Sequence, residues 1–258
     1  MTKIAAIASV TIREALRQKL AVNLLVFALA LVAASFTLSL LTFGEQYRII
    51  ANIGLSAMEV FGTLIAAFLG AGLISRDVER RTVYPIITKP VSRAQYVAGR
   101  YLGLVATTSA NLLVMASLFA VVLRFYLGGW GFLADTPLGL TVVAMAVQFA
   151  MVGAVATFFS AFSTATLSAI FTLAIVVAGH LSSDLVRYWS KQGEWAGRIG
   201  TALYAVVPNL EALDLKEAMV YKDPVQASFA VTGLGYGVLY AAALLALAAA
   251  VFSRRDLR

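Results

Sequence analysis

One ionisable side chain stands apart in this 258-residue chain because it lies well inside an apolar stretch. Glu59 is about ten residues into the stretch 49–74, which places it near the middle of a helix crossing about 30 Å of hydrocarbon. A carboxyl group at that depth is costly and usually functional. We therefore predict that Glu59 faces protein or a wet cavity on a transport pathway. The alternative is a structural carboxyl, protonated or hydrogen-bonded to a neighbouring helix.

Few other residues in apolar stretches could do chemistry. Asn111 and Gln148 are candidates for lining the same pathway, with an interhelical hydrogen bond as the alternative. His180 lies near the end of its stretch, so we interpret it as an interfacial side chain. Because it is the only histidine and cysteine is absent, we expect no metal site and no catalytic residue.

The sequence also lacks the motifs expected of a nucleotide-binding or nucleic-acid-binding site. A P-loop needs a Gly-Lys pair to cradle phosphates, and no lysine here follows a glycine. The metalloprotease pattern HExxH and the esterase pattern GxSxG are absent as well. Lysines and arginines cluster at the ends of apolar stretches, which argues for membrane orientation and against nucleic acid. We expect no cofactor on this chain.

The elements that position these residues are membrane helices. The chain is 61% hydrophobic and 13% charged, which excludes an ordinary soluble domain. The uncharged stretch 136–183 is about 70 Å long as one helix, so it must turn, most simply at 160–164. We predict an all-α integral membrane fold, forming a single transmembrane domain over 1–258. Its six spans lie at about 21–43, 50–75, 101–123, 138–160, 164–182 and 227–252.

Orientation follows from the short loops. Most lysines and arginines fall on the side of the termini, so both termini are predicted to be cytoplasmic. Charge alone also permits five spans, and length favours six. Residues 1–20 fit an amphipathic helix on the membrane surface, with Ile4, Ala8 and Ile12 on one face and Arg13 on another. The alternative is a positively flanked start of span one. The loop 183–226 lies outside, and its aromatic rings favour the headgroup level or, alternatively, an accessory protein on the outer face.

The inner loop between spans two and three holds the densest charge. A helix is expected to continue from span two, with Asp77 and Arg81 paired, until Pro85 breaks it. Ser92 and Gln95 then form a capping box for span three. Ile86 and Ile87 are apolar at the water-facing end of the loop, which favours a docking element over an ordinary positively charged loop.

These residues resemble the type 2 permeases of ATP-binding-cassette (ABC) transporters. The similarity lies in the run 69–82, the block Lys89-Pro90-Val91-Ser92-Arg93 and the run 99–103, and it extends to 207–211 and 252–257. Asp77 replaces a common Glu and Arg100 a common Lys, and both changes keep the charge. The resemblance implies a homodimer in the inner membrane, a coupling helix between spans two and three, and two separate ATPase subunits that carry ATP and magnesium.

The resemblance also assigns roles in the inner loop. The docking tip would be Ile86, Ile87, Thr88 and Lys89, surrounded by a charged collar. The collar residues are Arg76, Asp77, Glu79, Arg80, Arg81 and Arg93. None of these residues does covalent chemistry.

Three functions remain open at this stage. The first is an export permease driven by separate ATPases. The second is an ion- or proton-coupled secondary transporter using Glu59, which would need internal repeats or more polar residues within the membrane. The third is an intramembrane enzyme, which the absence of catalytic motifs disfavours. Substrate identity is not encoded in any pattern we find.

Overall fold

The computed structural model describes residues 3–40, 44–79, 92–182, 187–189, 195 and 207–254. Within these ranges all regular structure is helical. In chain order the elements are α1 (Lys3–Leu16), α2 (Lys19–Ser39), α3 (Gln46–Ala71), α4 (Ser75–Glu79), α6 (Arg93–Leu127), α7 (Phe132–Asp135), α8 (Leu138–Ser160), α9 (Ala165–His180), the 3-10 turn η1 (Glu211–Leu213), α12 (Lys216–Tyr221) and α13 (Ala227–Arg254).

Five helical segments of the described chain are long and apolar enough to cross a membrane: α2, α3 with α4, α6, α8 and α13. The predicted all-helical membrane architecture is therefore confirmed. The turn at 160–164 is confirmed too, because α8 ends at Ser160 and the Thr164 side chain accepts a hydrogen bond from Leu167 N. However, α9 has 16 residues, or about 24 Å of helix. A sixth span stays a prediction.

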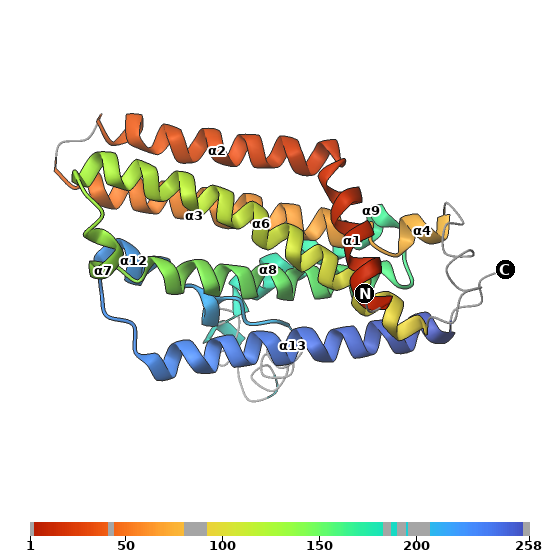
Figure 1. Ribbon diagram of the computed structural model, residues 1–258. Helices are drawn as coiled ribbons and strands as arrows, with labels where there is room; N and C mark the ends of the chain where they lie inside the picture. The colour runs from red at the N-terminus through yellow and green to blue at the C-terminus, as the bar shows by residue number, and fades with distance from the viewer. Residues whose placement is uncertain are drawn as a thin grey trace.

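The spanning helices form a bundle with α3 near its centre, α2 along one edge and α13 along the opposite edge (Figure 1). α3 packs against α2, α6, α8 and α9. Its close approach to α8 requires Gly70, where an added Cβ would lie 2.6 Å from Ala156 Cβ. α2 and α13 bury little of their surface and expose Phe27 and Leu239. Such apolar exposure suits contact with lipid.

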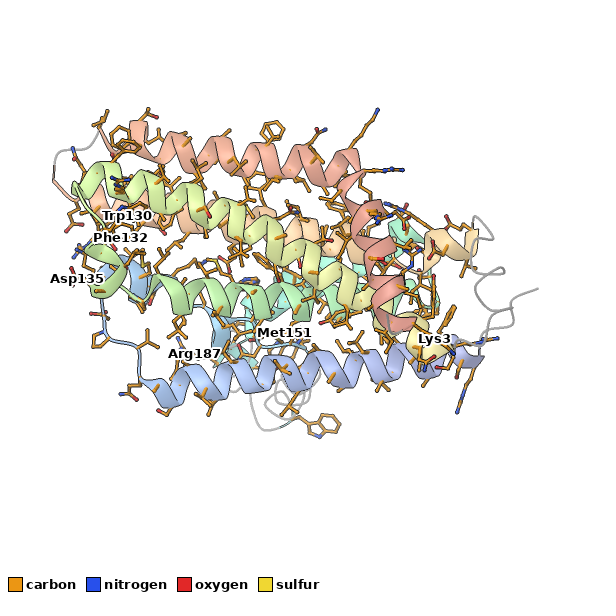
Figure 2. The ribbon with its side chains drawn as sticks, in the orientation of Figure 1. Lys3, Trp130, Phe132, Asp135, Met151 and Arg187 are labelled. Carbon is orange, nitrogen blue, oxygen red and sulfur yellow. The ribbon has the colours of Figure 1, made fainter. Side chains whose placement is uncertain are left out.

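Both α1 and the last turn of α13 lie at one end of the bundle, which we call the termini end, while α7 and α12 lie at the other, the far end (Figure 1). Figure 2 places Trp130, Phe132 and Asp135 at the far end and Lys3 at the termini end. At the far end α6 ends at Leu127 and is capped by Gly128, whose φ of 73° lies in the left-handed region. The Arg124 guanidinium lies 4.9 Å from the Trp130 ring centroid, an arrangement typical of a membrane boundary.

Helix α1 is separate from α2 and crosses the termini end of the bundle (Figure 1). It packs on α6, where Gly103 permits contact because an added Cβ would lie 2.7 Å from the Ala8 carbonyl oxygen. Thr11 and Ala15 are its buried residues. The helical conformation is interrupted at 17–18, before α2 begins. This face of α1 is held by α6, so the helix has a fixed place in the fold.

The helix following span two is interrupted earlier than the sequence predicts. α3 ends at Ala71, and a turn over 72–74 leads into the short α4. The Ser160 hydroxyl accepts hydrogen bonds from the Ile74 and Ser75 backbone N–H groups, both at 3.0 Å. The expectation of an unbroken helix to Pro85 is therefore wrong, because α8 supplies the acceptor that stabilises this turn. The predicted capping box of Ser92 and Gln95 is confirmed at the start of α6.

Residues 207–221, which we call the inward segment, pack against the helical bundle. Leu210, Leu213 and Met219 are at most 2% exposed, and the segment packs against α3, α8 and α13. The aromatic side chains Trp195 and Tyr221 are exposed, as expected. The position of this segment relative to the membrane surface stays a prediction. Its leucines are buried by protein.

Candidate functional site: a buried carboxylate shared by four elements

The Glu59 carboxylate lies at the meeting point of α3, α8, α9 and α12. Its side chain is 7% exposed. Gln148 on α8 donates from Nε2 to Glu59 Oε1 at 3.0 Å, and His180 Nε2 lies 3.1 Å from the same oxygen. Lys216 on α12 forms an ion pair with the other oxygen, Oε2. We call these four residues the Glu59 cluster.

His180 faces two hydrogen-bond acceptors. Its Nδ1 lies 3.0 Å from the Val176 carbonyl oxygen, one turn earlier on α9, while Nε2 faces Glu59. Two acceptors are both satisfied only when both ring nitrogens carry a proton. The geometry therefore suits an imidazolium ion beside an ionised Glu59. Gln148 Nε2 lies 3.3 Å from His180 Nε2, and both nitrogens face the same Glu59 oxygen.

Lys216 is held between two carboxylates. Besides Glu59, its Nζ lies 3.3 Å from Asp214 Oδ2, and its backbone N–H donates to Asp214 Oδ1 at 3.0 Å. Burial disfavours the ammonium form, but the hydrogen bond to Glu59 and the charges of both acids outweigh it and raise the pKa of Lys216. The residue is therefore cationic throughout the physiological range. With Asp214 included, the cluster balances two positive and two negative charges.

The Glu59 cluster is more exposed on its cationic side. The side chains of Lys216 and His180 are 22% and 32% exposed, in contrast to the enclosed carboxylate. Gln148 is 1% exposed. One turn along α3, the buried Thr63 hydroxyl has no hydrogen-bond partner among the described residues. This arrangement can hold charge inside the membrane and exchange partners at its cationic edge, but it has no nucleophile for covalent chemistry.

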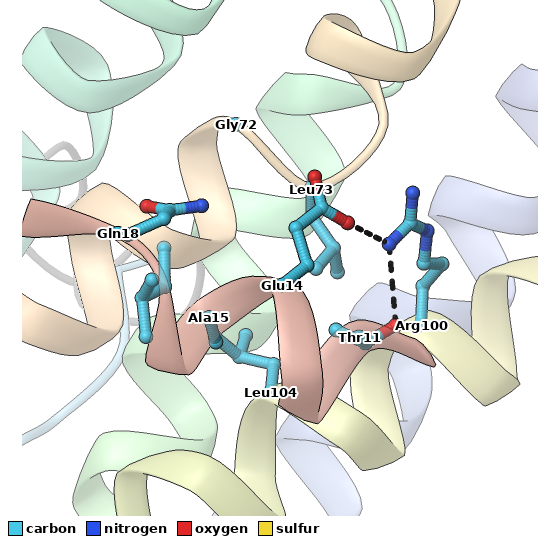
Figure 3. A pocket seen from close by; sticks show the side chains of 9 residues that line it. Thr11, Glu14, Ala15, Gln18, Gly72, Leu73, Arg100 and Leu104 are labelled. Carbon is cyan, nitrogen blue, oxygen red and sulfur yellow. Dashed lines mark hydrogen bonds and ion pairs between the residues drawn. The ribbon is translucent and has the colours of Figure 1, made fainter. Parts of the chain in front are cut away.

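A second ionic cluster lies at the termini end and joins α1, α4 and α6. Arg100 on α6 donates to Glu14 Oε2 at 2.6 Å and to Thr11 Oγ1 at 3.3 Å, beside a pocket shown in Figure 3. It also forms an ion pair with Asp77, which accepts a hydrogen bond from the Tyr96 hydroxyl. The side chains of Arg100 and Asp77 are each 7% exposed. We call this the Arg100 cluster.

The predicted charged collar is only partly described. Asp77 pairs with Arg100 and is buried, so it is not a free surface charge. Arg93 donates from Nη1 to the Phe252 and Ser253 carbonyl oxygens at 2.8 and 3.1 Å, which joins α6 to the end of α13. Arg76 and Glu79 lie on α4. The remaining coupling residues lie outside the described residues: Arg80, Arg81, Ile86, Ile87, Thr88 and Lys89.

Comparison with known families decides the identity. The family model described as "ABC-2 family transporter protein" matches residues 4–257, nearly the whole chain. The chain belongs to this ABC-2 family. A comparison with curated proteins gives no match. Members of the family are membrane permease subunits of ABC transporters, whose ATPase is on a separate chain.

Two of the three predicted pathway residues of this ABC-2 permease meet in the structure, and the third lies apart from them. Glu59 and Gln148 meet, whereas Asn111 is half-buried on α6 and outside the Glu59 cluster. Sequence reasoning missed His180 and Lys216 as partners of Glu59. A buried carboxylate requires cationic or donor partners, which is a signal, but nothing in the sequence shows that residues 121 and 157 positions away supply them.

Proposed function

We propose that this chain is the permease subunit of an ATP-driven exporter and forms the translocation pathway as a homodimer with two separate ATPase subunits. The observation that carries the proposal is the family match over residues 4–257. The absence of any Gly-Lys pair supports an energy source on another chain. In this assignment ATP and magnesium bind the partner ATPase and not this chain.

The proposed topology has six spans with the termini end in the cytoplasm of a cell with an inner membrane. α9 crosses about 24 Å, and the inward segment packs beside its end, so together they would complete the fifth crossing. α1 would lie at the cytoplasmic interface as an elbow helix before α2. Single cysteines placed in the cysteine-free chain at the exposed Ser92 and Thr164 should be labelled only from inside, and at Asp223 only from outside. Reversed labelling would contradict this topology.

Coupling to the ATPase is assigned to the segment that follows α4. Ile86 and Ile87, between Pro85 and Pro90, would insert into a groove of the ATPase, where burying each side chain contributes about 1.5–3 kcal/mol. α4 is joined to α1 and α6 through the Arg100 cluster. Movement of the tip would thereby reach the spanning helices.

The Glu59 cluster is assigned to the transport pathway. It also supports the second candidate, a secondary transporter, because an ionised carboxylate with histidine and lysine partners is the kind of group that exchanges protons. The two candidate functions differ in their energy source. ATP hydrolysis by a bound partner favours the exporter, whereas uptake or efflux driven by a pH gradient without ATP favours the secondary transporter.

The direct experiment is affinity purification of the full chain from its own membranes. We expect an ATPase with a P-loop to copurify and to hydrolyse ATP in the complex. A matched preparation of the Ile86→Asp, Ile87→Asp double variant should insert equally well and lose the ATPase. Purification of the chain without any ATPase, from membranes in which it is fully inserted, would contradict the proposal.

A further inference from the structure

The inward segment fits closely against three membrane helices. Leu210 and Leu213 are buried, and the Leu213 Cδ1 atom lies 3.2 Å from where a Cβ of Gly237 would be. Its backbone approaches α9 and α13 at two further glycines. An added Cβ would lie 2.6 Å from the Pro208 carbonyl oxygen at Gly179, and 2.6 Å from the Ala212 carbonyl oxygen at Gly233. The segment therefore fills space between these helices near the Glu59 cluster.

Neutral hydrogen bonds hold both ends of the inward segment. Leu210 N donates to the Gly179 carbonyl oxygen at 3.3 Å, and Asn209 N donates to the Tyr236 hydroxyl at 3.0 Å. At the other end, the Tyr47 hydroxyl donates to the Met219 carbonyl oxygen at 3.0 Å. Between these ends, the Lys216–Glu59 ion pair connects the segment to α3. Like the Tyr47 hydrogen bond, it is a polar connection of the segment with α3.

Both members of this ion pair have a second partner. If Lys216 leaves Glu59, it keeps Asp214, which belongs to its own segment. Glu59 in turn keeps His180 and Gln148. Breaking a buried ion pair is strongly unfavourable chiefly when it leaves an uncompensated charge. Here neither charge is left alone, so separation costs less than it would for an isolated pair.

The position of Glu59 links this contact to the rest of α3. Tyr47, in the first turn of α3, donates a hydrogen bond to Met219 of the inward segment. At its other end α3 leads through the turn at 72–74 into α4. A shift of α3 along or about its axis would therefore move Glu59 relative to Lys216. The exposed side of the cluster, at Lys216 and His180, would then gain access to water.

We propose that the Lys216–Glu59 ion pair is a releasable latch that keeps the inward segment closed against α3 and that opens during each transport cycle. The inference rests on the proposed function, because it requires a translocation pathway behind the segment. It differs from a static structural role in one respect. A static contact stays closed in every state, whereas a latch opens when the ATPase turns over.

The test uses the native absence of cysteine. Met219 is fully buried in the inward segment, so Met219→Cys should react slowly with a membrane-impermeant maleimide added from outside. Lys216→Met in this background should raise the labelling rate about 10-fold or more. Lys216→Arg retains the cation and should keep the slow rate. Equal rates in the Met and Arg variants would overturn the latch.

Two controls keep the outcome clear. Asp223→Cys, exposed beyond the segment, reports reagent access and should label equally fast in all backgrounds. Leu213→Cys is a second buried reporter in case Met219→Cys alters packing. Thermal unfolding in detergent should be similar for the Met and Arg variants. If the Met variant unfolds globally, Leu213→Cys in otherwise wild-type protein carries the test through its response to ATP.

Adding ATP to the complex tests the latch separately from the proposed function. In a complex with its copurified ATPase, Met219→Cys and Leu213→Cys should label several-fold faster during ATP hydrolysis than without ATP. Hydrolysis with unchanged labelling at both reporters would overturn the latch and leave the permease assignment intact. Failure of any ATPase to copurify would overturn the proposed function, and the comparison of Lys216→Met with Lys216→Arg would still decide whether the ion pair closes the segment.

Discussion

The Arg100 and Glu59 clusters use similar chemistry but differ in enclosure. Arg100 and Asp77 are each 7% exposed and tie α6 to α4, whereas Glu14, which ties Arg100 to α1, is 40% exposed. In the Glu59 cluster the carboxylate is 7% exposed, and its partners Lys216 and His180 are 22% and 32% exposed. The clusters therefore differ in the enclosure of the cation: an enclosed cation is costly to leave unpaired, whereas a partly exposed one can exchange partners more easily. The comparison indicates a fixed joint at the termini end and a releasable one deeper in the bundle.

The joints also differ in what each charge would keep after separation. Removing Arg100 takes the cation away from the buried Asp77 carboxylate, to which the Tyr96 hydroxyl donates a hydrogen bond. Separating Lys216 from Glu59 leaves each residue with another polar partner. The distinction gives each cluster a different expected response to mutation, and the variants below are ordered by the size of that response.

The largest effect is expected for Arg100→Met. The substitution removes the cation from an enclosed carboxylate, which costs about 3–5 kcal/mol when a buried pair loses one partner. Reversible unfolding in mixed micelles should show this loss of stability. Arg100→Lys keeps the charge and loses the forked geometry, so its loss should be smaller. Equal stability of wild type and Arg100→Met would show that the termini-end joint is not fixed.

An intermediate effect is expected for Ser160→Ala. The variant removes the acceptor for the Ile74 and Ser75 N–H groups, and each unsatisfied buried donor costs about 1–3 kcal/mol before relaxation. The same unfolding measurement should place its stability between wild type and Arg100→Met. Ser163→Ala, at a half-buried position of the same turn, is the matched control and should change little. A neutral Ser160→Ala would show that α4 is positioned by other contacts.

The smallest stability effect is expected for Glu59→Gln. The amide keeps the shape of the carboxylate but replaces one acceptor oxygen with a donor, while Lys216 retains Asp214, so the loss should be about 1.5–3 kcal/mol, the range of a hydrogen bond to a charged group. Insertion and assembly should be normal, but the Met219→Cys reporter should label faster than in the parent. A loss as large as that of Arg100→Met would make the Glu59 cluster a structural joint like the other.

The helical architecture could be read from sequence because it depends on local patterns. Apolar length predicted five spanning segments, Ser92 was a recognisable cap, and the turn at 160–164 followed from an excessive helix length. The break at 72–74 could not be predicted, because the hydroxyl that accepts its N–H groups comes from α8. Local sequence does not contain that contact.

Only part of the candidate site could be predicted from the sequence, for the same reason. An ionisable residue in an apolar stretch identifies itself, and Glu59 was found that way. Lys216 lies in a loop of mixed charge, and only tertiary packing of the inward segment brings it to Glu59. Arg100 and Asp77 carried a family resemblance, but their burial and pairing come from three elements meeting at one point.

The central claim is that a separate ATPase drives this permease, and its most direct measurement is ATP turnover by the purified complex before and after the Ile86→Asp, Ile87→Asp change. We predict normal membrane insertion, loss of the bound ATPase and loss of turnover in the purified sample. Trp130→Asp with Leu133→Asp, which charges exposed apolar residues at the far end, is the matched control and should keep the ATPase. Full binding and turnover in the double isoleucine variant would contradict coupling through this segment, and a wild-type sample without ATPase would contradict the account itself.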